Sequence, residues 1–140
     1  MPTSIIAYYT RRPDLSPAEF KNHMERVHVP IIKEVMGPLF PTTFTRRYVE
    51  RVESGAGDRL GAPAASKKSA DPTAPVVLVG SPSEITWDLM AELEFRDELH
   101  LQQGLAMMNA AEGQRMRDDE ENFTLPHQLR IILMEETITA

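Results

Sequence analysis

The sequence predicts an α+β fold in a single domain, residues 1–140. Three observations predict it. Residues 16–28 combine helix start signals with an apolar stripe at helical spacing, whereas residues 86–96 alternate between apolar and polar side chains as a strand does. Two β-branched segments, residues 4–10 and 127–138, stand near the ends of the chain. A chain of 140 residues is long enough for one hydrophobic core but not for two.

Composition excludes several classes of function. The net charge of −6 comes from 21 acidic and 15 basic residues that do not cluster, so nucleic acid is not an expected partner. The absence of cysteine excludes a disulfide scaffold and a thiolate nucleophile. No segment approaches the roughly 20 apolar residues of a membrane helix, and residues 5–9 are too short for a signal peptide. We therefore expect a soluble cytoplasmic protein without a membrane partner.

The first half of the chain opens with a strand and a well-marked helix. Residues 4–10, SIIAYYT, form the expected strand, and the turn-like residues 11–14 end it. Ser16 is a favourable N-cap, Pro17 suits the first helical turn, and Glu19 can complete a capping box.

The first helix is expected to be short. Its apolar stripe consists of Phe20, Met24, Val27 and Ile31. Pro30 disfavours helical geometry at Val29, so we expect the helix to end near His28, with residues 31–39 adding at most another turn or two. An imidazole at a helix C-terminus would be favoured in its protonated form.

A second strand and a long loop follow. Residues 42–52, TTFTRRYVERV, make a plausible strand. Its arginines indicate that one side faces solvent or an anionic ligand. Residues 53–74 are rich in Gly, Ala, Ser, Pro and Lys, and we expect them to be mobile; a disordered insertion is favoured over a lid. Residues 75–80, PVVLVG, resemble a short buried strand.

The second half repeats the pattern of strand, helix and strand. In residues 86–96, one face carries Trp87, Leu89, Ala91, Leu93 and Phe95. A helical interpretation of this window is possible, but the alternation favours a strand. Asp97 caps a second helix, and residues 113–123 either continue it or form a further, acidic helix. The charges of residues 115–121 are interpreted as a solvated face. Residues 127–138 form the last strand, whose two apolar sides imply burial on both faces.

The order of elements defines the topology. A β-α-β unit, a long loop and a second β-α-β unit predict the ferredoxin-like split βαβ arrangement, in which a four-stranded antiparallel sheet carries both helices on one face. No element remains to cover the other face of the sheet. We therefore expect a second copy of the chain to cover it, making a homodimer.

Several segments, in this order, resemble those of the EthD-like domain family. They are the opening YYTRRPDLSPAEFKNHMERVHVPIIKEV, the strand TFTRRYVERV, the segment ITWDLMAELEFRD, the acidic DDEENF and the closing EETIT. The later segments resemble the fungal secondary-metabolism branch of that family. The resemblance implies a homodimeric α+β barrel, usually without a metal or organic cofactor. It also implies relatives that act as decarboxylases, dehydratases and cyclases on aromatic polyketide intermediates.

Two residues are candidates for acid–base chemistry, and two tyrosines are candidates for stabilising an oxyanion. His28 has a side chain that titrates near neutrality, and the alternative is a structural histidine that bonds the following turn. Asp88 can orient His28 or take a proton itself; the alternative is a solvated carboxylate at a strand start. Tyr48 and Tyr9 can hydrogen-bond a developing oxyanion, or serve as core tyrosines. His23 is interpreted as a surface residue on another side of the helix.

Five residues are candidates for contact with a flat aromatic substrate: Tyr9, Met24, Arg47, Trp87 and Met90. The methionines also suit an ordinary core. No metal-ligand set and no glycine-rich phosphate loop is present, so neither a metal nor a cofactor is expected.

The sequence thus favours a cofactor-independent lyase or cyclase for an aromatic polyketide. Decarboxylation, dehydration and aldol closure all pass through an enolate that His28 could form. The alternatives are a cofactor-free oxygenase of anthrone-like phenols and a non-enzymatic dimer that binds a small hydrophobic ligand.

Overall fold

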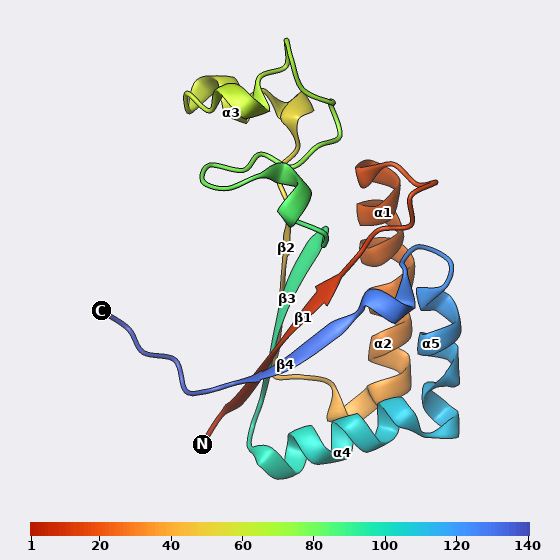
Figure 1. Cartoon of the computed structure of the whole chain (residues 1–140). Helices are drawn as coiled ribbons and strands as arrows, with labels where there is room; N and C mark the ends of the chain where they lie inside the picture. Colours follow the sequence, from red (N-terminus) through yellow and green to blue (C-terminus); the bar gives the residue numbers. More distant parts are fainter.

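A computed structural model describes residues 1–140 as two layers, one sheet and one set of helices (Figure 1). The strands are β1 (Thr3–Tyr9), β2 (Thr43–Tyr48), β3 (Leu89–Phe95) and β4 (Arg130–Met134). They lie in the order β2-β3-β1-β4, and every neighbouring pair is antiparallel. This is the predicted ferredoxin-like α+β arrangement, which is confirmed.

The helices are α1 (Pro17–His23), α2 (Val29–Met36), α3 (Ala56–Arg59), α4 (Glu98–Asn109) and α5 (Gln114–Glu120). All except α3 lie on one side of the sheet, and the opposite side is open (Figure 1). None of the helices is both long and apolar enough to span a membrane.

The core forms between the sheet and the helices. Alternate residues of β1 and β3 point into it, as the predicted periodicity requires: Ile5, Ala7, Tyr9, Leu89, Ala91, Leu93 and Phe95. Phe20, Met24 and Ile32 of the helical layer pack against them. Burial of these three residues holds the helices on the sheet, whereas Val27 of the predicted stripe is 40% exposed.

The first helix does not end at His28. Residues Met24–His28 form a π-helical turn, and the helix then continues as α2 to Met36. The Val29 N–H donates to the Met24 carbonyl five residues earlier. Pro30 lacks an N–H group and would clash with a carbonyl one turn earlier in a regular α-helix. The wider turn accommodates the proline, so the helix bulges where an end was predicted.

Two strand predictions are also wrong. Residues 75–80 are not a buried strand: only Pro75 forms a bridge, with Arg51, and Val79 is 94% exposed. No strand lies beside this segment to pair with it. β4 is a sheet edge, and all five of its residues are exposed on both faces within the single chain, contrary to the predicted burial.

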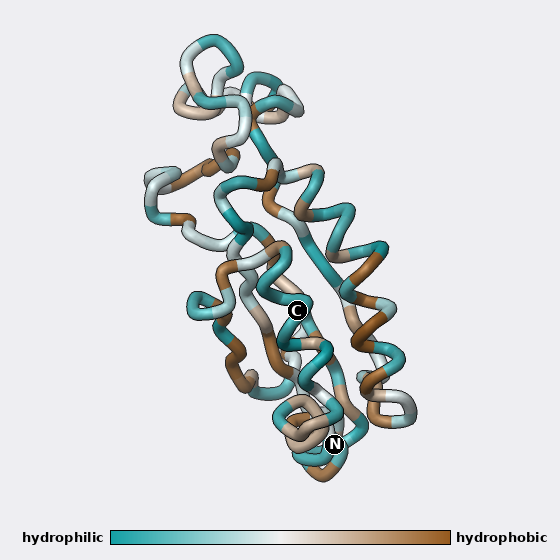
Figure 2. Tube along the Cα trace, turned by 90° about the vertical axis from the view of Figure 1, so that its right-hand side faces the viewer, coloured by the Kyte–Doolittle hydropathy of each residue, from teal (hydrophilic) through white to brown (hydrophobic).

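Residues 53–74 project beyond the end of the sheet and are hydrophilic or near neutral along most of their trace (Figures 1 and 2). The segment folds into short helical turns that include α3. Its neck is closed by backbone hydrogen bonds: the Val52 N–H donates to Ala74 (2.9 Å) and the Val76 N–H to Glu50 (2.8 Å). The expected mobility of this segment stays a prediction.

We expect Gly37→Ala to lower the free energy of unfolding by about 1–3 kcal/mol. Gly37 closes α2 with φ 50° and ψ −122°, a conformation that side-chain-bearing residues rarely adopt. No atom lies within 4 Å of an added methyl group, so the cost is backbone strain alone. Urea unfolding measures it, with the exposed Asn22→Ala as control, expected to change stability by less than about 0.5 kcal/mol. An unchanged unfolding midpoint for Gly37→Ala would contradict this geometry.

Candidate active site

Two histidines of the first helix converge on one carboxylate. In an α-helix, residues five apart point about 140° away from each other. In a π-turn the hydrogen bond joins residues five apart, so such residues lie closer to the same side of the helix. The π-turn at Met24–His28 thus brings His23 and His28 to the same side. His28 Nδ1 lies 2.8 Å from Asp119 Oδ2, and His23 Nε2 lies 3.0 Å from Asp119 Oδ1. The prediction that His23 is an unrelated surface residue is therefore wrong.

Asp119 comes from the acidic segment that was interpreted as a solvated face. It lies in α5, and only 7% of its side chain is exposed. Asn122 Nδ2 donates a third hydrogen bond to it (3.1 Å). Burial alone would raise the pKa of Asp119, but the hydrogen bonds from its three partners outweigh burial and hold the pKa below its usual value. Asp119 is therefore ionised at neutral pH.

The ionised carboxylate fixes the tautomer of His28. Because a carboxylate only accepts hydrogen bonds, Nδ1 of His28 carries the proton and Nε2 presents a lone pair. His28 is fully buried, and Nε2 has no hydrogen-bond partner. Burial lowers the pKa of His28, and Asp119 offsets this only in part. His28 is thus a neutral base at pH 7, contrary to the protonated form expected for a helix end.

A second buried histidine shows what a structural role looks like in this chain. His100 is 1% exposed, its Nδ1 accepts from the Arg96 N–H (3.1 Å), and its Nε2 donates to the Leu39 carbonyl (2.9 Å). Both of its nitrogens are satisfied. Buried polar atoms are nearly always paired, so the free Nε2 of His28 marks it as the exceptional residue of the two.

Aromatic side chains surround the imidazoles. The Phe123 ring stacks on His23 with centroids 4.5 Å apart and lies 5.0 Å from His28. The Tyr9 ring meets His28 edge-on at 6.5 Å. Tyr9 and Met24 were predicted to line the site, and both lie in the core on the His28 side of the sheet.

Tyr48 is occupied elsewhere. Its hydroxyl donates to the carboxylate of Glu25, which also receives two hydrogen bonds from Arg46 (2.7 and 2.8 Å). Burial, followed by the hydrogen bond to Glu25, raises the pKa of Tyr48 far above its usual value. The predicted oxyanion donor therefore anchors β2 to the π-turn in this structure.

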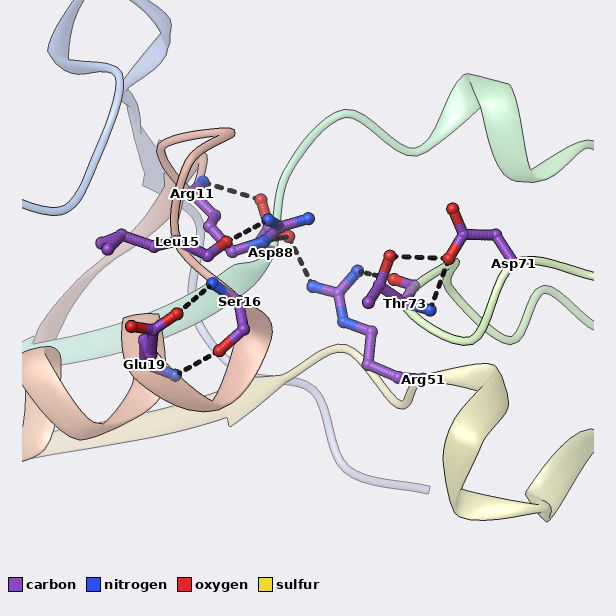
Figure 3. A network of polar contacts seen from close by, with 8 residues as sticks. All are labelled: Arg11, Leu15, Ser16, Glu19, Arg51, Asp71, Thr73 and Asp88. Carbon is purple, nitrogen blue, oxygen red and sulfur yellow. Dashed lines mark hydrogen bonds and ion pairs between the residues drawn. The ribbon is translucent and has the colours of Figure 1, made fainter.

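Asp88 does not orient His28, which is the role that Asp119 fills. Asp88 accepts from the Arg11 backbone N–H (2.7 Å) and side chain (3.3 Å), and from Arg51 (Figure 3). Arg51 also donates to the Thr73 carbonyl (3.3 Å). This cluster joins the ends of β1 and β3 to the neck of the projecting segment.

The remaining three candidates lie on the other side of the sheet. Arg47 and Met90 are cross-strand partners on the open face, where Tyr8 also lies. Trp87 precedes β3 and contacts the Tyr8 ring at 5.0 Å. The sheet separates these residues from His28, so the predicted set divides into two groups.

A cleft lies at the start of α1. It has a volume of about 390 Å³ and lies between α1 and the end of β2, with Phe20, Tyr48, Arg51 and Asp88 among its lining residues. Phe20, which lines this cleft, packs with its ring 5.5 Å from that of Phe123, and the Phe123 ring lies 5.0 Å from His28. No group of three or more His, Asp or Glu side chains is arranged to hold a metal ion.

We expect Asp119→Asn to lower the free energy of unfolding by about 1–3 kcal/mol at pH 7, because the buried His28 and the partly exposed His23 lose an ionised partner. The pKa of Asp119 is lowered from 3.8, so the carboxylate stabilises the fold above that value and loses this effect as the pH falls through its folded pKa. The difference from the parent protein should therefore shrink below about pH 4. Urea unfolding at both pH values measures it, with the exposed Asp118→Asn as control. An equal difference at both pH values would contradict the ionised state of Asp119.

The chain is similar to known proteins in sequence and in fold. The EthD domain model matches residues 12–127. Curated protein sequences give no significant match. An ethyl tert-butyl ether d (EthD) family protein from Bacillus halodurans aligns with a TM-score of 0.55 and 22% identity, covering 98% of this chain and 100% of that one.

Two further solved structures are similar. An EthD-like protein from Ralstonia eutropha has a TM-score of 0.51 and 12% identity, over 95% of this chain and 87% of that one. Rv0793 from Mycobacterium tuberculosis has a TM-score of 0.50 and 11% identity, over 100% and 99%. At these identities the likeness shows a shared fold. The match over residues 12–127 goes further, and the chain belongs to the EthD domain family.

Proposed function

We propose that this chain is a cofactor-independent lyase or cyclase that acts on an aromatic, polyketide-like carbonyl compound. The observation that supports it best is the unpaired Nε2 of the fully buried His28, whose other nitrogen is fixed by Asp119. A neutral imidazole with one oriented nitrogen and one free lone pair is the arrangement of a general base.

The chemistry begins with proton transfer from carbon. His28 Nε2 takes a proton from the carbon next to a carbonyl group, and the imidazolium that forms is stabilised by the negative charge of Asp119. The enolate oxygen needs a hydrogen-bond donor. Since Tyr48 donates to Glu25, we assign this role to Tyr9, which lies edge-on to His28. Burial raises the pKa of Tyr9 well above its usual value, so its hydroxyl stays protonated.

The surroundings of His28 favour such a step. Aromatic side chains exclude water from the imidazole, which strengthens the interaction between a developing charge and Asp119. We assign the 390 Å³ cleft as the approach for substrate, with rotation of Phe20 opening the way inward. A cofactor-free oxygenase would use the same carbanion, and oxygen uptake during turnover distinguishes it.

The open face of the sheet favours a second function, binding of a hydrophobic ligand by a dimer. Tyr8 and Trp87 form an aromatic pair there, and Ile132 and Met134 of β4 are 47% and 44% exposed. We propose that a second copy packs on this face as the other half of an α+β barrel, with Arg47 and Met90 inside. In a purely binding protein, removal of His28 would leave ligand affinity unchanged.

We expect the protein to sediment as a homodimer of about twice the chain mass of 15.8 kDa at micromolar concentration. A charge on the open face should prevent this, so Ile132→Glu should sediment as a monomer. Leu99→Glu is the matched control: Leu99 is exposed on α4, in the helical layer, and this variant should remain a dimer. A parent protein that stays monomeric would contradict the barrel.

We expect His28→Ala to lower turnover at least about 100-fold, the usual contribution of a general base. Turnover is followed by chromatography with an aromatic β-keto acid and a β-hydroxy ketone as probes. His28→Gln should do no better, because an amide forms hydrogen bonds but cannot accept a proton at neutral pH. His100→Gln controls for the loss of a buried histidine and should retain turnover in its folded fraction. Full activity of His28→Gln would show that another residue is the general base.

A further inference from the structure

His23 and His28 share a single negative charge. His28 Nδ1 lies 2.8 Å from Asp119 Oδ2, whereas His23 Nε2 lies 3.0 Å from Oδ1 and 3.1 Å from Oδ2 of the same carboxylate. Asn122, the third partner of Asp119, is uncharged. The cluster therefore offers one negative charge to two side chains that can each become a cation.

The two imidazoles differ in their access to water. The His23 side chain is 23% exposed, whereas that of His28 is fully buried. A protonated His23 keeps part of its hydration and also lies beside Asp119. A protonated His28 has no water around it and depends on Asp119 to balance its charge. As the pH falls, the first proton to enter the cluster therefore goes to His23.

Protonation of His23 uses the charge of Asp119. A second proton on His28 would then leave a net positive charge in the cluster, which is costly in a buried environment. The titratable groups that face His28 are Asp119 from α5, His23 from its own helix and Tyr9 from β1, whose ring meets it edge-on at 6.5 Å. Burial raises the pKa of Tyr9, so its phenol supplies no further negative charge. Burial lowers the pKa of His28, Asp119 opposes this, and the charge of His23 adds to the lowering.

We propose that His23 is a positioning residue that controls the strength of His28 as a base through the shared carboxylate. The proposal rests on the proposed function, because it takes His28 as the base. In that reaction the α-proton moves to His28 Nε2, and the electron pair of the C–H bond stays on the substrate as the enolate. Neutral His23 leaves the whole charge of Asp119 to the imidazolium that forms, and protonated His23 withdraws it. The rate should therefore fall as His23 gains a proton, although His28 itself is still neutral.

Nitrogen-15 NMR of the imidazoles measures this coupling without a substrate. In the parent protein we expect His23 to gain its proton at a higher pH than His28. His23→Gln keeps a hydrogen-bond donor beside Asp119 but cannot be protonated, so the titration midpoint of His28 should rise by about 1 pH unit. His23→Arg keeps a permanent charge there, so the midpoint should stay near that of the parent. His127→Gln removes an exposed histidine elsewhere and should leave the midpoint unchanged.

The pH profile of turnover tests the consequence for the base, with the aromatic β-keto acid and the β-hydroxy ketone as probes. In the parent protein, the rate should fall at the midpoint of His23. In His23→Gln it should fall only at the lower midpoint of His28, so the variant is faster than the parent in acid. At pH 8, above the usual titration range of histidine, His23→Arg should be about threefold to tenfold slower than the parent.

Other results overturn the proposal. The two histidines do not compete for Asp119 if His28 gains its proton before His23, or if His23→Gln leaves the midpoint of His28 unchanged. A rate that His23→Gln lowers by the same factor at every pH would assign His23 a structural role. If the parent protein converts neither probe, the proposed function fails, while the NMR midpoints still decide whether His23 governs the proton affinity of His28. Should His23→Gln not fold, the order in which the two histidines are protonated in the parent protein decides.

Discussion

The missing N–H of Pro30 sets the geometry of the helical layer. A regular α-helix cannot pass through this proline without losing a hydrogen bond and meeting a carbonyl, so the backbone takes one π-turn just before it. That turn rotates His28 inward and brings it to the same carboxylate as His23. It also places Glu25 where Tyr48 and Arg46 of β2 can bind it. One backbone defect therefore positions the candidate base and attaches the helix to the edge of the sheet.

Local patterns in the sequence predicted the fold because the sheet is regular. Along β3, from Leu89 to Phe95, buried residues alternate with partly exposed ones. Ser16 and Asp97 cap their helices with side-chain oxygens, as expected. The predictions were wrong where contacts between distant parts of the chain, or between molecules, determine the structure. Pro30 is a helix-ending signal that the packed stripe of Met24 and Ile32 overrides. β4 was interpreted from its apolar faces, but burial of an edge strand depends on a second molecule.

The sequence predicted one part of the candidate site and missed the other, again because tertiary contacts determine which side chains are buried. His28 stood out because of its titration range, but its partner Asp119 lies 91 residues away, inside a run of charges that looks like a solvated surface. Only the packing of α5 against the π-turn reveals which of those carboxylates is buried. The spacing of His23 and His28 held a usable signal: two histidines five apart, shortly before a proline, would face the same side if the intervening turn were π-helical.

Two buried carboxylates illustrate the difference between structural and chemical roles. Asp88 is held by two arginines and a backbone N–H (Figure 3), so its charge is fully compensated and it joins three segments of chain. Asp119 is held by two imidazoles, one of which keeps a free nitrogen in a dry environment. Arginine remains charged at every physiological pH, whereas an imidazole changes charge near neutrality. The first cluster is therefore inert towards protons, whereas the imidazoles of the second can gain or lose one.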